Sequence, residues 1–148
     1  AVSKTRQMVE LGYRVVVNDD REEFCSPEAV PEADEYILSE AGELPSRMTM
    51  DERTAVVLAT RDMTIDTHGL PEILGERVSY VGVISSRRRW RLTEEKLKEA
   101  GVREMDLKRV HAPIGLDLNA ETPEEIALSI MAEVVMVQRG GAGKPLSN

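Results

Sequence analysis

The sequence predicts an α/β domain in which helices cover both faces of a mostly parallel, doubly wound sheet. Segments 13–17, 54–60 and 78–84 are short, apolar and rich in β-branched residues. Strands that are apolar on both faces are typical of parallel sheets, because helices pack against each side. Segments with helical periodicity alternate with these strands, which is the order that such a fold requires.

The first helix is expected over residues 1–11, where apolar side chains recur at helical spacing and Gly12 provides a typical stop. The strand at 13–17 then ends in Asn-Asp-Asp. Residues 21–33 contain two prolines and indicate a loop, and residues 35–38 form a weaker strand candidate.

The centre of the chain repeats the pattern of strand, helix and strand. Residues 54–60 predict a buried strand, and 66–76 predict a helix. Pro71 favours the first turn of that helix, so we expect it to start near Gly69 or Leu70. Residues 78–84 predict the next buried strand.

A charged helix follows from Arg87 to about Ala100, with Gly101 as its stop. Residues 104–110 indicate one or two helical turns.

The last helix carries the clearest end signals in the sequence. Thr122 is the expected N-cap, Pro123 suits the first helical position, and Glu125 completes a capping box. Gly140 ends the helix. We therefore expect one domain over residues 1–139 and a flexible tail over 140–148.

The order of elements resembles that of a dinucleotide-binding domain from its first helix onward. Such domains begin with a strand and a Gly-rich turn before the first helix, and an acidic residue follows about 20 positions after the glycines. Here the helix comes first, and Asp19 and Asp20 follow the strand at 13–17. We therefore expect the first strand and its Gly-rich turn to lie upstream of Ala1.

Composition excludes several classes of protein. The 148 residues carry a net charge of −8, which argues against a general nucleic-acid binder. Cys25 is the only cysteine, so neither an intramolecular disulfide nor a cysteine-based zinc cluster is expected. The apolar runs are too short to span a bilayer, and no signal-peptide pattern is visible. These features predict a cytoplasmic protein that does not enter membranes.

The charge is distributed unevenly. Residues 87–109 contain nine basic and five acidic side chains, although the whole chain is acidic. Most of this segment is explained by a solvated helix with mixed charge. Ser85, Ser86 and Arg87 differ, because they follow an apolar strand and open a helix, where backbone N–H groups and the helix dipole favour an anion. We expect an anion site there.

Ligands of open parallel sheets bind outside the carboxyl ends of the strands. The residues expected to bind a ligand at that edge are Asp19, Arg21, Thr60, Asp62, Gly82, Ser85, Ser86, Arg87, Pro113, Ile114 and Gly115. Asp19 can accept both hydrogen bonds of a ribose diol, or it can cap a turn. The segment 111–117 can form a binding loop, or it can be a connection that packs into the core.

No catalytic constellation is visible. His68 and His111 are isolated, and no metal-ligand spacing occurs. Cys25 lies in an acidic loop, which disfavours an activated thiolate. A non-catalytic binding protein is therefore favoured over an enzyme.

Several segments together resemble the XdhC/CoxI family, and specifically its C-terminal Rossmann-like domain. The matching residues are Val17-Asn18-Asp19-Asp20-Arg21, Phe24, Ala55 to Thr60, Asp62, Asp66, Tyr80 to Ile84 with Ser86-Arg87, His111 to Asp117, and Thr122 to Ala127 with Ser129, Ile130, Ala132 and Glu133. Three positions depart from the family pattern: Ser85 and Asn119 replace glycines, and Arg61 replaces a frequent histidine.

The resemblance implies an accessory protein that binds the molybdenum cofactor, molybdopterin, and helps to mature a molybdenum hydroxylase such as xanthine dehydrogenase. Molybdopterin carries a phosphate, which suits an anion site at Ser85-Ser86-Arg87. The alternative is an NAD(P)-dependent oxidoreductase or nucleotide-using transferase on the same fold. A homodimer is a further expectation.

Overall fold

In the described residues, five short strands form two parallel sheets with helices on both sides. The structure is a computed structural model, and it describes residues 2–147. In chain order the elements are α1 (Val2–Glu10), β1 (Val16–Asp19), the 3₁₀ turn η1 (Glu22–Phe24), β2 (Glu35–Leu38), the 3₁₀ turn η2 (Ala41–Glu43), α2 (Leu44–Arg47), β3 (Ala55–Leu58), α3 (Met63–Leu74), β4 (Tyr80–Val83), α4 (Arg87–Glu99), α5 (Glu104–Leu107), β5 (Val110–His111) and α6 (Pro123–Arg139).

The strands pair in two groups. In the first group β1 pairs with β2, with Val16 opposite Glu35. In the second group the order is β3-β4-β5, with Ala55 opposite Tyr80 and Val81 opposite Val110. All three pairings are parallel, which confirms the predicted sheet type, but no ladder joins β1 to β3 within the described residues.

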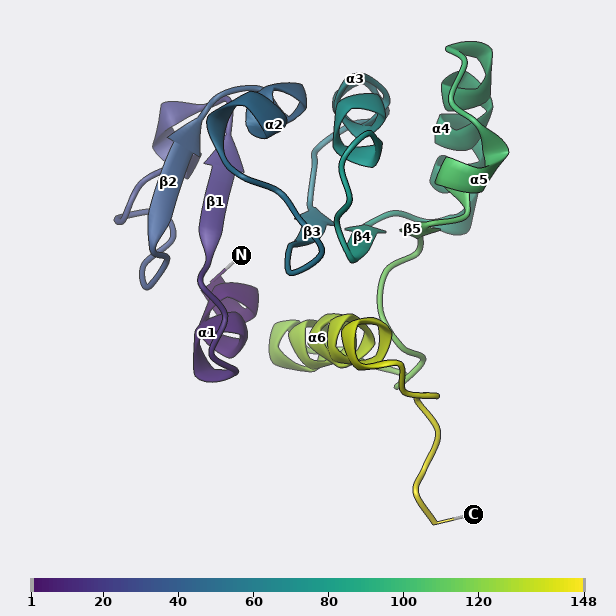
Figure 1. Cartoon of the computed structure of the whole chain (residues 1–148). Coiled ribbons are helices and arrows are strands. Elements are labelled where there is room, and N and C mark those ends of the chain that lie inside the picture. The colour runs from purple at the N-terminus through teal and green to yellow at the C-terminus, as the bar shows by residue number, and fades with distance from the viewer. Residues whose placement is uncertain (1, 148) are drawn as a thin grey trace.

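Helices lie on both faces of the strands, so the predicted doubly wound α/β arrangement is confirmed. Figure 1 shows α2, α3 and α4 above the strands, with α1 and α6 below them. One apolar cluster packs under α2, α3 and α4, and a second packs against α6. Alternate residues of β3 serve the two clusters, because Val56 packs into the first and Val57 into the second.

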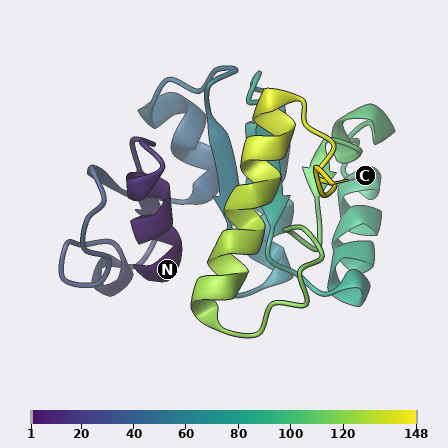
Figure 2. The same cartoon turned by 90° about the horizontal axis from the view of Figure 1, so that it is seen from below.

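Helices α1 and α6 run side by side in the same direction (Figure 2). Gln7, in the second half of α1, donates a side-chain hydrogen bond to the Glu124 carbonyl at the start of α6, at 2.9 Å. Tyr13, three residues after α1, donates its hydroxyl to the Gln138 side chain near the end of α6, at 2.6 Å. Gln138 also reaches Ser79, just before β4, so both helices begin at the edge where the strands end.

The helix ends confirm the predicted signals. Gly12 and Gly101 follow α1 and α4 with positive φ angles of 89° and 93°. Thr122 Oγ1 accepts a hydrogen bond from the Glu125 N–H, and the Glu125 carboxylate accepts one from the Thr122 N–H. These local patterns were readable because each needs only residues within one turn of the helix.

Helix α3 differs from its prediction. It begins at Met63, and Pro71 lies inside it instead of in its first turn. Asp62 caps the helix by accepting the Ile65 N–H at 3.1 Å. Leu70 and Ile73 are fully buried, so tertiary packing outweighs the hydrogen bond that Pro71 cannot donate.

Other differences are smaller. The first strand begins at Val16, three residues later than expected, and Val30 is buried within the otherwise largely exposed loop before β2. Neither α2 nor β5 was predicted, because each is only a few residues long. Within the described part of the tail, residues 141–147 form no helix or strand, and its flexibility remains a prediction.

Across residues 2–147, no helix combines the length and apolar composition needed to cross a bilayer.

A candidate anion site at the carboxyl edge

The loops that follow the strands gather charged and polar side chains at one edge of the molecule. Asp19 ends β1, Thr60 follows β3, and Ser85 and Ser86 follow β4. Arg61, after β3, donates hydrogen bonds to Asp20, after β1, at 3.2 and 3.3 Å. The structure therefore brings the predicted segments after β1 and β3 within reach of each other.

Asp19 is held by its neighbour Arg21. The carboxylate accepts the Arg21 N–H at 2.9 Å and two guanidinium hydrogen bonds at 3.0 and 3.1 Å. The guanidinium also lies 4.1 Å from the centre of the Phe24 ring. Partial burial by itself would raise the pKa of Asp19, but the hydrogen bonds and charge of Arg21 together keep that pKa below its ordinary value. Turn capping is thus the role seen for Asp19.

A buried ionic cluster lies between β3 and the start of α4. Asp66 is 1% exposed, and its carboxylate pairs with the Arg89 guanidinium at 3.0 Å. The Thr60 hydroxyl hydrogen-bonds to the same carboxylate, and Arg89 also lies 3.3 Å from that hydroxyl. The cluster fixes the loop after β3 against the first turn of α4.

Sequence analysis named Asp66 only among the residues that carry the family resemblance, and it predicted neither the burial of Asp66 nor its pairing with Arg89. The burial of Asp66 could have been predicted from its spacing, because Asp66, Leu70 and Ile73 lie on one face of the helix. Arg89 could not be separated from Arg87 and Arg88 within the same basic run. The structure turns Arg89 inward and leaves the other two exposed.

The first turn of α4 offers free backbone donors. Ser86 is the N-cap, and its hydroxyl oxygen accepts the Arg89 N–H at 3.1 Å. Within the described chain, the N–H groups of Arg87 and Arg88 have no protein acceptor, as expected at a helix start. The helix dipole adds a partial positive charge at this point. A helix start with unpaired N–H groups favours an anion, and the anion site at this turn stays a prediction.

One buried donor near this helix start is unsatisfied. Among the described residues, Nε of Arg89 is the only buried side-chain nitrogen or oxygen without a hydrogen-bond partner. Buried polar groups are usually paired, so this donor is an exception among the described residues.

The loop after β5 is fixed by its own backbone. The Ile114 N–H donates to the Val83 carbonyl at 3.1 Å, and the Gly115 N–H donates to Glu133 at 3.0 Å. The Ser129 hydroxyl donates to the Leu116 carbonyl at 2.6 Å. Because these N–H groups are already bonded, neither Ile114 nor Gly115 has a free backbone donor for a ligand, and their role in binding stays a prediction.

Glu133 organises this part of the molecule from within α6. The residue is 8% exposed, and its carboxylate accepts hydrogen bonds from the Tyr80 hydroxyl at 2.7 Å and from the Gly115 N–H. His111 stacks on Tyr80, with ring centres 4.8 Å apart, and its Nδ1 lies 3.8 Å from the same carboxylate. Burial, together with the Glu133 carboxylate, raises the pKa of the Tyr80 hydroxyl well above its usual range.

The remaining predicted residues have different placements. Gly82 lies inside β4, where an added Cβ would collide with Ile114 and with the Tyr80 hydroxyl. Because Gly82 has no side chain, the loop after β5 can pack directly against β4. Asp62 caps α3, and Pro113 follows a cis peptide bond in the 111–117 loop.

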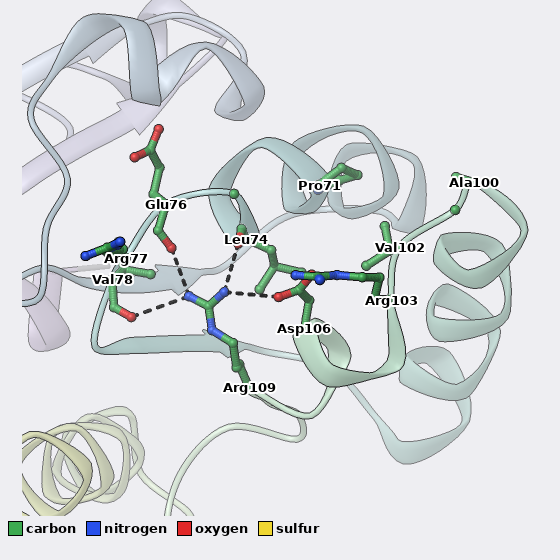
Figure 3. Close-up of a pocket in the computed structure, with 12 residues that line it drawn as sticks. Pro71, Leu74, Glu76, Arg77, Val78, Ala100, Val102, Arg103, Asp106 and Arg109 are labelled. Atoms are coloured by element: carbon green, nitrogen blue, oxygen red, sulfur yellow. Dashed lines mark hydrogen bonds and ion pairs between the residues drawn. The ribbon is translucent and has the colours of Figure 1, made fainter.

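The hollow in Figure 3 lies at the opposite edge, where β4 and β5 begin. Its volume is about 790 Å³, and Arg103 and Asp106 are among its lining residues. Arg109 donates hydrogen bonds to the carbonyls of Leu74 and Glu76 at 2.8 and 3.0 Å. Arg109 therefore holds the chain between α3 and β4. Because this arginine is already bonded to the main chain, we locate the candidate site at the carboxyl edge instead of in this hollow.

The described residues contain no group of three or more His, Cys, Asp or Glu side chains arranged to hold a metal ion.

Removing Arg89 should leave the buried Asp66 carboxylate without its cation. We expect Arg89→Ala to lower the free energy of unfolding by about 3 kcal/mol. Arg88→Ala, at an exposed neighbouring position, should change it by less than about 0.5 kcal/mol. Urea denaturation of both variants measures the difference. Equal stability of the two variants would contradict a structural role for the Asp66–Arg89 pair.

Removing Arg21 should raise the pKa of Asp19, because the hydrogen bonds that favour the carboxylate are lost while partial burial remains. The pairing stabilises the fold above the ordinary pKa of 3.8, and this contribution is lost as the pH falls through the lowered pKa. Carboxyl NMR titration of Arg21→Ala measures the change. Arg14→Ala, which removes a contact with Glu35, is the control. An unchanged Asp19 titration in Arg21→Ala would refute the interpretation.

Comparison with known proteins places these features in a family. Residues 1–134 match the model described as the XdhC Rossmann domain. A crystal structure described as a xanthine dehydrogenase from Bacillus halodurans matches 99% of the chain with a TM-score of 0.78 and 25% identity. The match covers 41% of that protein.

Two curated relatives are also longer than this chain. A protein of Bacillus subtilis (strain 168), named as a probable subunit of xanthine dehydrogenase, is 28% identical over 88% of the chain and 37% of its own length. The molybdenum cofactor insertion chaperone PaoD from Escherichia coli (strain K12) is 30% identical over 60% of the chain and 28% of its own length. The chain thus spans well under half of each relative. Since the family model matches nearly all of its residues, the chain belongs to the XdhC family and corresponds to its Rossmann domain.

Proposed function

We propose that this domain binds the molybdenum cofactor for an accessory protein that matures a molybdenum hydroxylase of the xanthine dehydrogenase type. The family membership and the similarity to the insertion chaperone PaoD support this proposal. In it, the first turn of α4 receives the phosphate of molybdopterin. The partner enzyme then receives the cofactor from the accessory protein.

The observation that carries the proposal is the donor set at α4. The N–H groups of Arg87 and Arg88 are free of protein acceptors within the described chain, and the Arg87 side chain is exposed beside them. Phosphate binds well to such a group, because it can accept several charge-assisted hydrogen bonds at once.

The second candidate function is an NAD(P)-dependent oxidoreductase or nucleotide-using transferase. The position of Asp19 at the tip of β1 favours it, since a carboxylate there can bind a ribose diol. However, both Asp19 oxygens already accept hydrogen bonds from Arg21. A nucleotide would have to displace or share those bonds, so we favour the molybdenum cofactor.

Titration of the protein with molybdenum cofactor and with NAD(H), followed by thermal shift, tests the proposal. Arg87→Ala should weaken cofactor binding about tenfold, because it removes a charge-assisted contact. Arg91→Ala is the matched control, since Arg91 is an exposed arginine one turn further along α4. We expect the control to bind like the parent protein.

Two results would overturn the proposal. Tight binding of NAD(H) without binding of the molybdenum cofactor would favour the second function. Equal affinities of Arg87→Ala and the parent would rule out the anion site at the first turn of α4.

A further inference from the structure

The outer face of α6 carries an apolar stripe that no other described element crosses. Figure 2 shows this helix in front of the sheet along its whole length. Its outward-facing side chains recur every three or four residues, so they share one face of the helix. We call this set the α6 stripe, and it consists of Glu124, Leu128, Ala132, Val135 and Arg139.

The α6 stripe forms the floor of a groove with a volume of about 830 Å³. Leu116 in the loop after β5 borders this groove, as do Gln7, Glu10 and Leu11 at the end of α1. Leu128 is 52% exposed and Leu11 is 54% exposed. A connected apolar surface of this kind on a globular protein marks an interaction site.

The two ends of the α6 stripe carry opposite charges. Glu124 lies in the first turn of α6, and Arg139 is the last residue of the helix. Among the described residues, neither charged group has an ion-pair or hydrogen-bond partner. Glu125, in contrast, is held by the capping box. Glu124 and Arg139 are therefore both available to a partner.

The α6 stripe has the symmetry that two antiparallel copies require. Glu124 and Arg139 lie equally far from its centre, and so do Leu128 and Val135. When a second α6 packs antiparallel on the first, Glu124 lies opposite Arg139 and Leu128 lies opposite Val135. A two-fold axis repeats each contact, which closes the assembly at two copies. Parallel packing instead places Glu124 against Glu124.

A small side chain lies at the centre of the α6 stripe. Ala132 lets the axes of two helices approach to about 8 Å, the short end of the range for packed helices. The helix has 17 residues and is therefore about 25 Å long. Such a contact is long enough for the apolar centre and both charged ends to pair at once.

We propose that two copies of this chain associate through their α6 stripes, packed antiparallel about Ala132. Leu128 and Val135 of both copies form the apolar centre. Ion pairs between Glu124 of one copy and Arg139 of the second, formed twice, set the antiparallel direction.

The sequence alone indicated no surface for a homodimer, whereas the α6 stripe fixes both the surface and the direction of packing. The candidate anion site is at the start of α4, on the other side of the strands from α6 (Figure 1). The inferred interface therefore leaves that site open and does not depend on the proposed function.

Sedimentation equilibrium of the 148-residue chain measures its self-association. We expect a monomer–dimer equilibrium that Leu128→Asp weakens at least about 100-fold, because each dimer loses two apolar contacts and gains two desolvated charges. Leu92→Asp is the matched control, since Leu92 is also exposed but lies on α4. We expect this control to dimerise like the parent protein, and circular dichroism checks that each variant keeps its helices.

Charge reversal tests the antiparallel direction. Glu124→Arg or Arg139→Glu alone places like charges opposite each other across the interface. Each single variant should therefore weaken the dimer about tenfold. The double variant exchanges the two charges and should restore the affinity to within about threefold of the parent protein.

Any of three results would overturn the proposal. The first is a chain that stays monomeric up to about 1 mM. The second is equal weakening of the dimer by Leu128→Asp and Leu92→Asp, which would place the interface away from α6. The third is a double charge-reversal variant that dissociates as readily as the single variants, which would exclude antiparallel packing.

Discussion

The carboxylate of Glu133 joins three segments that are distant in the sequence. A buried carboxylate must be hydrogen-bonded, and here Tyr80 of β4 and the backbone of Gly115 supply the donors. These bonds hold α6 against the sheet and fix the loop after β5. That loop can lie close to β4 only because Gly82 has no side chain. The shape of the carboxyl edge therefore depends on one polar contact within the core.

The charged groups of this edge divide into bonded and free sets. Asp66, Arg89 and Thr60 bind one another, and Asp19 binds Arg21. The free donors are concentrated at the first turn of α4. A protein with a net charge of −8 can thus offer a local site to one small anion. Salt screens the repulsion between that anion and the distant acidic side chains, so the repulsion acts only over a short range. At the opposite edge, Arg109 is bonded to main-chain carbonyls and has a structural role.

Features encoded within one helical turn were predictable from the sequence. The capping box of Thr122 and Glu125 needs only neighbouring residues, so its prediction is confirmed at both hydrogen bonds. Long-range features were not predictable in this way. The inward turn of Arg89 depends on where the fold places Asp66, and the start of α3 depends on packing that outweighs Pro71. The loop at 113–115 was expected to bind ligand, and its backbone bonds to Val83 and Glu133 form only once the fold is assembled.

Amide chemical-shift mapping during titration with molybdenum cofactor tests the central claim most directly. We expect the largest shifts at Arg87 and Arg88, with smaller changes at Thr60 and Arg21 on the same edge. Shifts concentrated around Arg103 and Arg109 at the opposite edge would contradict the anion site at α4, as would binding that leaves the first turn of α4 unperturbed.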